Sequence, residues 1–109
     1  MIQPGTVVTV EFPGALGLKR RPAVVVSSPT YHTTRPDVVL GLLTSQTASA
    51  TGPTDYTLHD WSAASLHSAS AFRAFFATLP ATTVSVIGHL SGRDWQAIQA
   101  RLRIALAVE

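Results

Sequence analysis

The residues best suited to chemistry in this sequence are the adjacent cations Lys19–Arg21, which run through Pro22 into the apolar segment Ala23–Val26. Cationic side chains require water or a polyanion, whereas a β-branched run belongs in a core. A basic loop that enters a buried strand at Pro22 would satisfy both, with the cations at the rim of a small sheet. Because proline restricts the residue before it, Arg21 is predicted to be well positioned, and its guanidinium fork suits a phosphate.

A second polar cluster, residues 44–47, follows the apolar run at 38–43. If the two apolar segments form neighbouring strands, Thr44 would lie at the same rim as Arg21. A hydroxyl would then stand beside a bidentate phosphate binder. The alternative for the cations is a solvated loop, since most charged side chains simply face water.

Other chemistries have little support in the spacing of polar residues. The chain has four histidines, His32, His59, His67 and His89. Their spacing does not match that of metal ligands. The few carboxylates suggest no glycosidase pair, because Asp94 is explained by the start of a helix. No Gly-x-Ser-x-Gly elbow is present, and no Gly-Lys-Ser/Thr follows the glycines at 14 and 17. We therefore expect neither a metal nor another cofactor.

Two further groups have ordinary structural explanations. Three arginines near the C-terminus fit the solvent face of a helix. Three phenylalanines favour a core or a subunit interface over a base-stacking platform. The first group is Arg93, Arg101 and Arg103, and the second is Phe72, Phe75 and Phe76.

Length and composition indicate one domain, residues 1–109, with a single core. The chain has 109 residues, of which 46% are apolar, and a net charge of +2 that is too small to identify a partner. It has no cysteine, which excludes disulfides and fits a cytoplasmic protein. The apolar runs are far shorter than the roughly 20 residues of a membrane span, and the N-terminus has no signal core.

The hydrophobic pattern predicts a mainly β domain that ends in a helix. Strands are predicted at residues 6–12, 23–27, 38–43, 55–58 and 84–88, with a flexible connection at 13–18 and a polar loop at 28–37. Ser91 is predicted to cap the helix. Its apolar stripe comprises Trp95, Ile98, Leu102, Ala105 and Leu106. A turn at 59–66 would fold Trp61 onto the core, and 68–79 fits helix or strand.

Taken together, these segments resemble the MazF/PemK/Kid family of toxin endoribonucleases from toxin-antitoxin systems. Lys19–Ser27 is similar to the family's Arg-Pro that starts an apolar strand ending in Ser. Gly5–Phe12 looks like its opening strand, and Val38–Ser45 like the next strand with its Thr-Ser ending. Weaker similarities follow in order to the helix, so the likeness spans nearly the whole chain. It favours a strand at 68–79.

The resemblance implies an α+β, mainly β fold: a small SH3-like (CcdB/Kid-type) antiparallel barrel with a C-terminal helix. It implies a homodimer that a cognate antitoxin neutralises by covering the RNA groove. It also implies metal-independent cleavage of single-stranded RNA, in which the 2′-hydroxyl attacks the neighbouring phosphate. The products are a 2′,3′-cyclic phosphate and a 5′-hydroxyl.

Carried onto this chain, the resemblance makes Arg21 the group that stabilises the phosphorane charge and Thr44 a hydrogen-bond donor to the scissile phosphate. Such electrostatic stabilisation is typically worth about 3 kcal/mol. The residues expected to bind RNA without cutting it are Lys19, Arg20, Ser45, Gln46 and Arg73.

The sequence departs from the family pattern at several positions. Thr6 replaces the usual acid after Gly5, and Ser65 stands where many members have glycine. Phe75 takes the place of an acid two residues after Arg73, and no histidine lies between residues 12 and 21. The protein could be a slow nuclease, a nuclease with a substitute proton carrier such as His32, or a degenerate RNA- or antitoxin-binding module. A non-catalytic gyrase inhibitor resembling CcdB is the further alternative.

Overall fold

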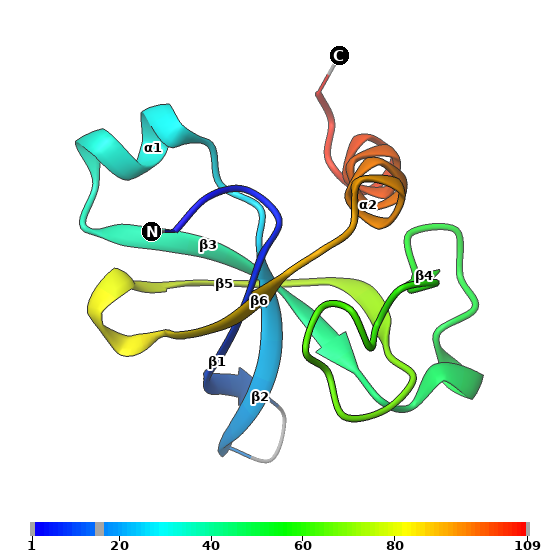
Figure 1. The fold of residues 1–109 in the computed structure, drawn as a ribbon. Helices are drawn as coiled ribbons and strands as arrows, with labels where there is room; N and C mark the ends of the chain where they lie inside the picture. The colour runs from blue at the N-terminus through cyan, green and yellow to red at the C-terminus, as the bar shows by residue number, and fades with distance from the viewer. Residues whose placement is uncertain (1, 15–16, 109) are drawn as a thin grey trace.

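The computed structural model describes residues 2–14 and 17–108 and shows one six-stranded antiparallel sheet with a C-terminal helix (Figure 1). The strands are β1 (Thr6–Gly14), β2 (Gly17–Val25), β3 (Asp37–Thr44), β4 (Tyr56–Thr57), β5 (Ala71–Pro80) and β6 (Ser85–His89). Their order across the sheet is β4-β5-β3-β2-β1-β6. The helices are α1 (Pro29–Thr34) and α2 (Gly92–Ala105), with short 3₁₀ turns η1 (Thr47–Ser49) and η2 (Ala81–Thr83).

The sheet curls into a half-barrel, and Figure 1 shows its strands crossing one another steeply around a common centre. This confirms the predicted fold class of a small, mainly β barrel with a C-terminal helix. Curling divides the buried residues into two clusters. One, including Phe72 and Ile98, is packed by α2 and the segment between β4 and β5, and the other, including Phe12 and Leu40, fills the opposite side of the sheet.

Strand β2 is buried on both faces where the sequence predicted it. Val24 belongs to the first cluster, whereas Ala23 and Val25 belong to the second, and all three are completely buried. Consecutive strand residues point to opposite faces, so an uninterrupted apolar run is what a two-sided core requires.

The predicted basic loop is wrong, because Lys19–Arg21 belongs to β2. The long hairpin with β1 pairs Phe12 with Lys19 and Glu11 with Arg20. Glu11, Lys19 and Arg20 are exposed, whereas Phe12 is buried in the second cluster. Pairing of β2 with β3 begins only at Ala23, so Pro22 has no β3 residue beside it. A strand tolerates proline at such a position, because its missing N–H leaves no partner unsatisfied. The predicted connection at 13–18 is thus mostly strand, and its residues 15–16 lie outside the described residues.

The predicted polar loop at 28–37 contains α1. Ser28 caps this helix by accepting a hydrogen bond from the Tyr31 amide at 3.2 Å, and Pro29 occupies the first turn. The short helix was not predicted because this segment contains two prolines and several threonines, which are typical of loops. The strand assigned to 68–79 is confirmed from Ala71 onward.

Helix α2 confirms the Ser91 cap, whose Oγ accepts the Asp94 amide at 3.3 Å. Ile98 is buried, and Trp95 and Leu102 pack against the same cluster. The predicted stripe extends too far, since the helix ends at Ala105 and Leu106 is 44% exposed. Within the described residues, no helix is long and apolar enough to cross a membrane.

Candidate active site

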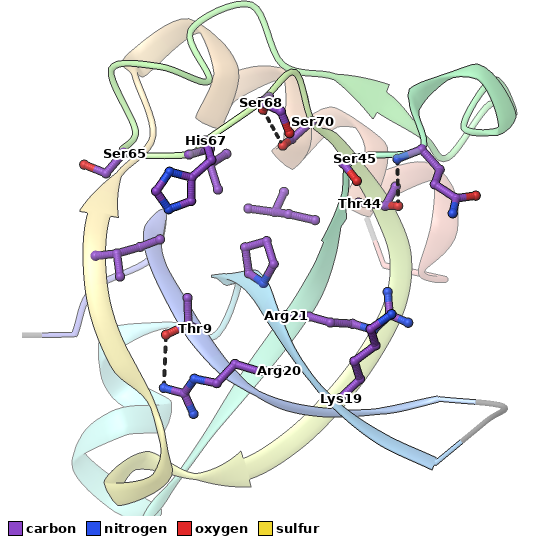
Figure 2. Close-up of a pocket in the computed structure, with 15 residues that line it drawn as sticks. Thr9, Lys19, Arg20, Arg21, Thr44, Ser45, Ser65, His67, Ser68 and Ser70 are labelled. Atoms are coloured by element: carbon purple, nitrogen blue, oxygen red, sulfur yellow. Dashed lines mark hydrogen bonds between the residues drawn. The ribbon is translucent and has the colours of Figure 1, made fainter.

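A pocket of about 640 Å³ opens where the first half of β2 and the end of β3 meet the segment between β4 and β5 (Figure 2). The β1–β2 hairpin contributes Thr9 and residues 19–22, the end of β3 contributes residues 43–46, and the facing segment contributes residues 65–68 and Ser70. Ile87 of β6 completes the lining. Three of these side chains are cationic and none is a carboxylate, so the pocket favours an anionic ligand.

Arg21 and Thr44 both line this pocket, as their predicted adjacency requires. Ala23 pairs with Leu42, and continuing that register by two residues sets Arg21 opposite Thr44. Thr44 Oγ1 accepts the Gln46 amide at 3.1 Å, which leaves the hydroxyl hydrogen available for a ligand. Among residues 2–14 and 17–108, the Arg21 guanidinium makes no hydrogen bond or ion pair. Its guanidinium donors therefore have no acceptor among these residues.

Lys19 and Arg20 differ in how they are held. Arg20 Nη2 donates to Thr9 Oγ1 and to Ser85 Oγ, both at 3.1 Å, and so ties β2 across β1 to β6. Strand alternation places Lys19 on the side of Arg21, and Figure 2 shows these two side chains running together while Arg20 turns toward Thr9. Thr9 and Ser85 were missed in the sequence because neither stands near a motif.

Ser45 and Gln46 line the main pocket, but Arg73 does not. Arg73 lies in an adjacent hollow of about 410 Å³, which it shares with Arg21 and Asp55. Its Nε is 3.5 Å from Asp55 Oδ1. The structure therefore brings six of the seven predicted site residues to one pocket and sets the seventh beside it, with Arg21 between the two hollows.

The chain that leads into the facing segment is anchored at residues 56–60 by Asp94, which is completely buried at the start of α2. Its Oδ1 accepts the Tyr56 hydroxyl at 2.6 Å and the His59 amide at 3.0 Å, and its Oδ2 accepts the Asp60 amide at 2.8 Å. Burial, and secondly this hydrogen bond to Asp94, raises the pKa of Tyr56 to about 12. Asp94 is thus more than the helix-start residue expected from the sequence.

Asp60 completes the anchor from the other side. Its carboxylate accepts Arg93 Nε at 2.7 Å, Arg93 Nη2 at 2.8 Å and Ser91 Oγ at 2.6 Å. The Arg93 guanidinium, with the Ser91 hydroxyl, holds the pKa of Asp60 well below its usual range. Arg93 is therefore a structural partner and not only a solvated cation of the helix. The two carboxylates together fix the chain at 59–60 to the N-terminus of α2.

Ser65 is the strained residue of this segment, with φ of +69°. Glycine adopts such a conformation freely, whereas a side chain there costs on the order of 1–2 kcal/mol. The neighbouring Gly88 of β6 explains how the turn fits, because a Cβ on Gly88 would stand 2.5 Å from the Ala64 carbonyl oxygen and 3.0 Å from Ser65 Oγ. The segment is thus pressed against β6, with Ser65 Oγ beside Gly88, while Ser65 remains one of the residues that line the pocket.

His32, the substitute proton carrier considered from the sequence, lies away from the pocket. Its Nε2 is 2.6 Å from Ser27 Oγ, which also accepts the Val39 amide. Those residues stand at the opposite ends of β2 and β3 from Arg21 and Thr44. The structure therefore does not support a role for His32 in the pocket, and it places His67 there instead.

Solved structures with the same curled sheet and terminal helix define the class of fold. A mycobacterial endoribonuclease in complex with its cognate antitoxin matches with a TM-score of 0.80 and 21% identity, over 100% of this chain and 98% of that one. MazF in a MazE–MazF crystal structure from Deinococcus radiodurans matches with a TM-score of 0.75 and 18% identity, over 98% and 97%. Mycobacterium tuberculosis toxin MazF-mt6 matches with a TM-score of 0.75 and 14% identity, over 95% and 98%.

The family follows from the sequence itself. The model of the PemK-like, MazF-like toxins of type II toxin-antitoxin systems matches residues 3–106, and the chain belongs to this family. A comparison with curated protein sequences gives no match. The resemblance seen in the Arg-Pro strand is therefore confirmed over nearly the whole chain.

Proposed function

We propose that this toxin is an endoribonuclease that cleaves single-stranded RNA at the pocket between β2, β3 and the segment 65–70. The observation that carries the proposal is the meeting, in a cationic pocket, of the Thr44 hydroxyl hydrogen with an Arg21 guanidinium that has no partner among the described residues. None of the carboxylates of those residues lines the pocket. Such donors stabilise a phosphate as its negative charge increases.

In the proposed reaction, the 2′-oxygen of one nucleotide forms a bond to the adjacent phosphorus while the bond from phosphorus to O5′ breaks. Arg21 stabilises the charge on the non-bridging oxygens, and Thr44 donates a hydrogen bond to the same phosphate. Lys19, Arg20, Ser45 and Gln46 hold the strand along the pocket, and Arg73 extends the cationic surface beyond it. In this proposal no metal takes part, since the RNA supplies the nucleophile and Arg21 stabilises the charge on the phosphate.

Partners follow from the same surface. The structural neighbours include toxins solved with an antitoxin, and an acidic antitoxin segment would compete with RNA for the cationic pocket. We further propose a homodimer, supported by apolar side chains that α2 and its C-terminal extension leave exposed, Ile104, Leu106 and Val108. We also propose a cytoplasmic location, where the proposed RNA substrate would be met. Light scattering of the purified protein measures its subunit number.

The test is cleavage of a defined, unstructured RNA in the presence of a chelator, with mapping of both product ends. Wild-type protein is expected to leave a 2′,3′-cyclic phosphate and a 5′-hydroxyl. Arg21→Ala is expected to lower the rate about 10²-fold or more. Arg103→Ala, an exposed arginine on α2, is the matched control and should retain the wild-type rate.

Full cleavage by Arg21→Ala would contradict the proposed site. Salt-sensitive RNA binding without products would identify a binding module instead. Trapping of gyrase on DNA with RNA left intact would identify the CcdB-like alternative.

A further inference from the structure

We propose that His67 is the general base of RNA cleavage, taking the proton from the attacking 2′-hydroxyl. This inference rests on the proposed endoribonuclease activity. Its starting point is a chemical requirement that the predicted site residues leave unmet. Lys19, Arg20 and Arg21 stabilise negative charge, but their charged side chains have no acceptor for a proton.

The described part of the chain offers one imidazole at this pocket. His67 is a lining residue, whereas His32 bonds to Ser27 at the far end of β2 and His89 Nδ1 lies 2.8 Å from the Leu90 carbonyl oxygen. The His59 ring lies beside the Tyr56 ring, with 6.1 Å between their centroids. None of the carboxylates of the described residues lines the pocket. Histidine is also the side chain that most readily exchanges protons near neutral pH.

The His67 side chain is exposed, yet its backbone is held on both sides. Leu66 is buried in the core, and its amide donates to the Trp61 carbonyl oxygen at 3.2 Å. Ser70, also buried, donates through Oγ to the Ser68 carbonyl oxygen at 2.9 Å. A base must be positioned as well as present, and anchored neighbours supply that positioning.

The arrangement of the walls fits this role. Figure 2 shows His67 on the wall opposite the β2 cations, so a phosphate bound at Arg21 would lie with its nucleotide between the two walls. Within the described residues, the His67 ring makes no hydrogen bond, and a ring nitrogen remains available as an acceptor. Ser65, with its positive φ, begins the run of residues 65–68 that lines the pocket.

The proton balance of the step is complete. The neutral ring takes the 2′-hydroxyl proton as the bond from O2′ to phosphorus forms and the bond from phosphorus to O5′ breaks. The departing O5′ takes a proton from water, and the imidazolium then releases its proton to the solvent. The enzyme returns to its starting state.

The test compares His67→Gln with His59→Gln, an exposed histidine outside the pocket, on the full chain. Single-turnover rates are measured from pH 5 to 8 on the RNA that wild-type protein cleaves, and affinity is measured with a 2′-O-methyl version that cannot be cut. Loss of a general base lowers rates by about 10² to 10⁴-fold. We expect that loss for His67→Gln, together with loss of the rate increase with pH, at wild-type affinity and melting temperature. His67→Ala should regain rate when imidazole is added.

The inference is overturned if His67→Gln cleaves at the wild-type rate, or if it loses rate but keeps the wild-type pH profile. It is also overturned if the loss is entirely in RNA affinity. In each of these cases the wild-type protein still cleaves RNA, and the proposed function stands. Absence of cleavage by wild-type protein would overturn both.

Discussion

Replacing Asp94 by asparagine tests whether the buried carboxylate at the start of α2 holds the segment that faces the cations. The substitution preserves shape but exchanges one oxygen for an NH₂ group. If the remaining oxygen keeps the Tyr56 and His59 bonds, the new NH₂ meets the Asp60 amide, donor against donor. The mutant therefore loses a hydrogen bond to a charged group and leaves a buried donor unsatisfied.

The magnitude follows from these two losses. A hydrogen bond to a charged group contributes about 1.5–3 kcal/mol, and an unsatisfied buried donor costs about 1–3 kcal/mol. These two costs overlap, because both describe the same broken hydrogen bond, one from each partner. We therefore expect the free energy of unfolding to fall by about 3 kcal/mol. With a urea m-value of about 2 kcal/mol/M, the unfolding midpoint should fall by roughly 1.5 M. A domain of ordinary stability, about 5–15 kcal/mol, remains folded.

The control is the same substitution at Asp37, which forms a surface pair with Arg35 at 3.0 Å. The Arg35 side chain of this pair is 57% exposed. Exposed pairs contribute about 0–1 kcal/mol, so Asp37→Asn should shift the midpoint by less than about 0.5 M. Hydrogen exchange adds a local readout, since the amide of Asp60 should lose protection in Asp94→Asn. Equal urea midpoints for the two variants would refute the reasoning.

Two further predictions concern the same segment. Ser65→Gly should raise the free energy of unfolding by about 0.5–1 kcal/mol in urea titrations, because relief of the positive φ exceeds the added entropy of the unfolded chain; Ser65→Ala, which keeps a Cβ, should give no such gain. The lowered pKa of Asp60 contributes stability above the pKa of an unfolded carboxyl, about 3.9, that is lost as pH falls below it. Thermal melts of Asp60→Asn should therefore decline less steeply below pH 4 than those of wild type, and parallel declines would count against this linkage.

The part of the fold that could be predicted is the part in which side-chain burial alternates or runs continuously along a strand. Apolar runs predicted the Val-rich part of β2 and the strand at 38–43. The pairing of these two strands brings Arg21 and Thr44 to the same pocket. The hairpin arm at 17–21 was missed because an exposed strand carries no burial pattern. Backbone hydrogen bonds to β1 hold this arm, and almost any residue except proline can form them, so they leave no pattern in the sequence.

The other wall of the pocket gave no sequence signal for a different reason. Residues 65–70 lie in irregular chain, and the chain just before them is fixed at 59–60 by Asp94 and by the Asp60 carboxylate, whose partners lie more than 30 residues away along the sequence. No periodicity reports such a contact. A buried aspartate after a capping serine looks the same in sequence as an ordinary helix-start residue. For this reason the sequence pattern offered only one test of His67, its spacing as a metal ligand, and gave no indication that it lies at the pocket.

The two walls of the pocket thus rest on separate supports. Arg21 depends on the register of β2 with β1 and β3, whereas the chain that leads to His67 is attached at residues 59–60 to the N-terminus of α2. Loosening that attachment in Asp94→Asn should displace the proton acceptor while leaving the phosphate-binding side chains in place. Cleavage should accordingly fall more than RNA affinity does. The opposite ratio would mean that the segment 65–70 binds RNA and that the chemistry resides wholly on the strands.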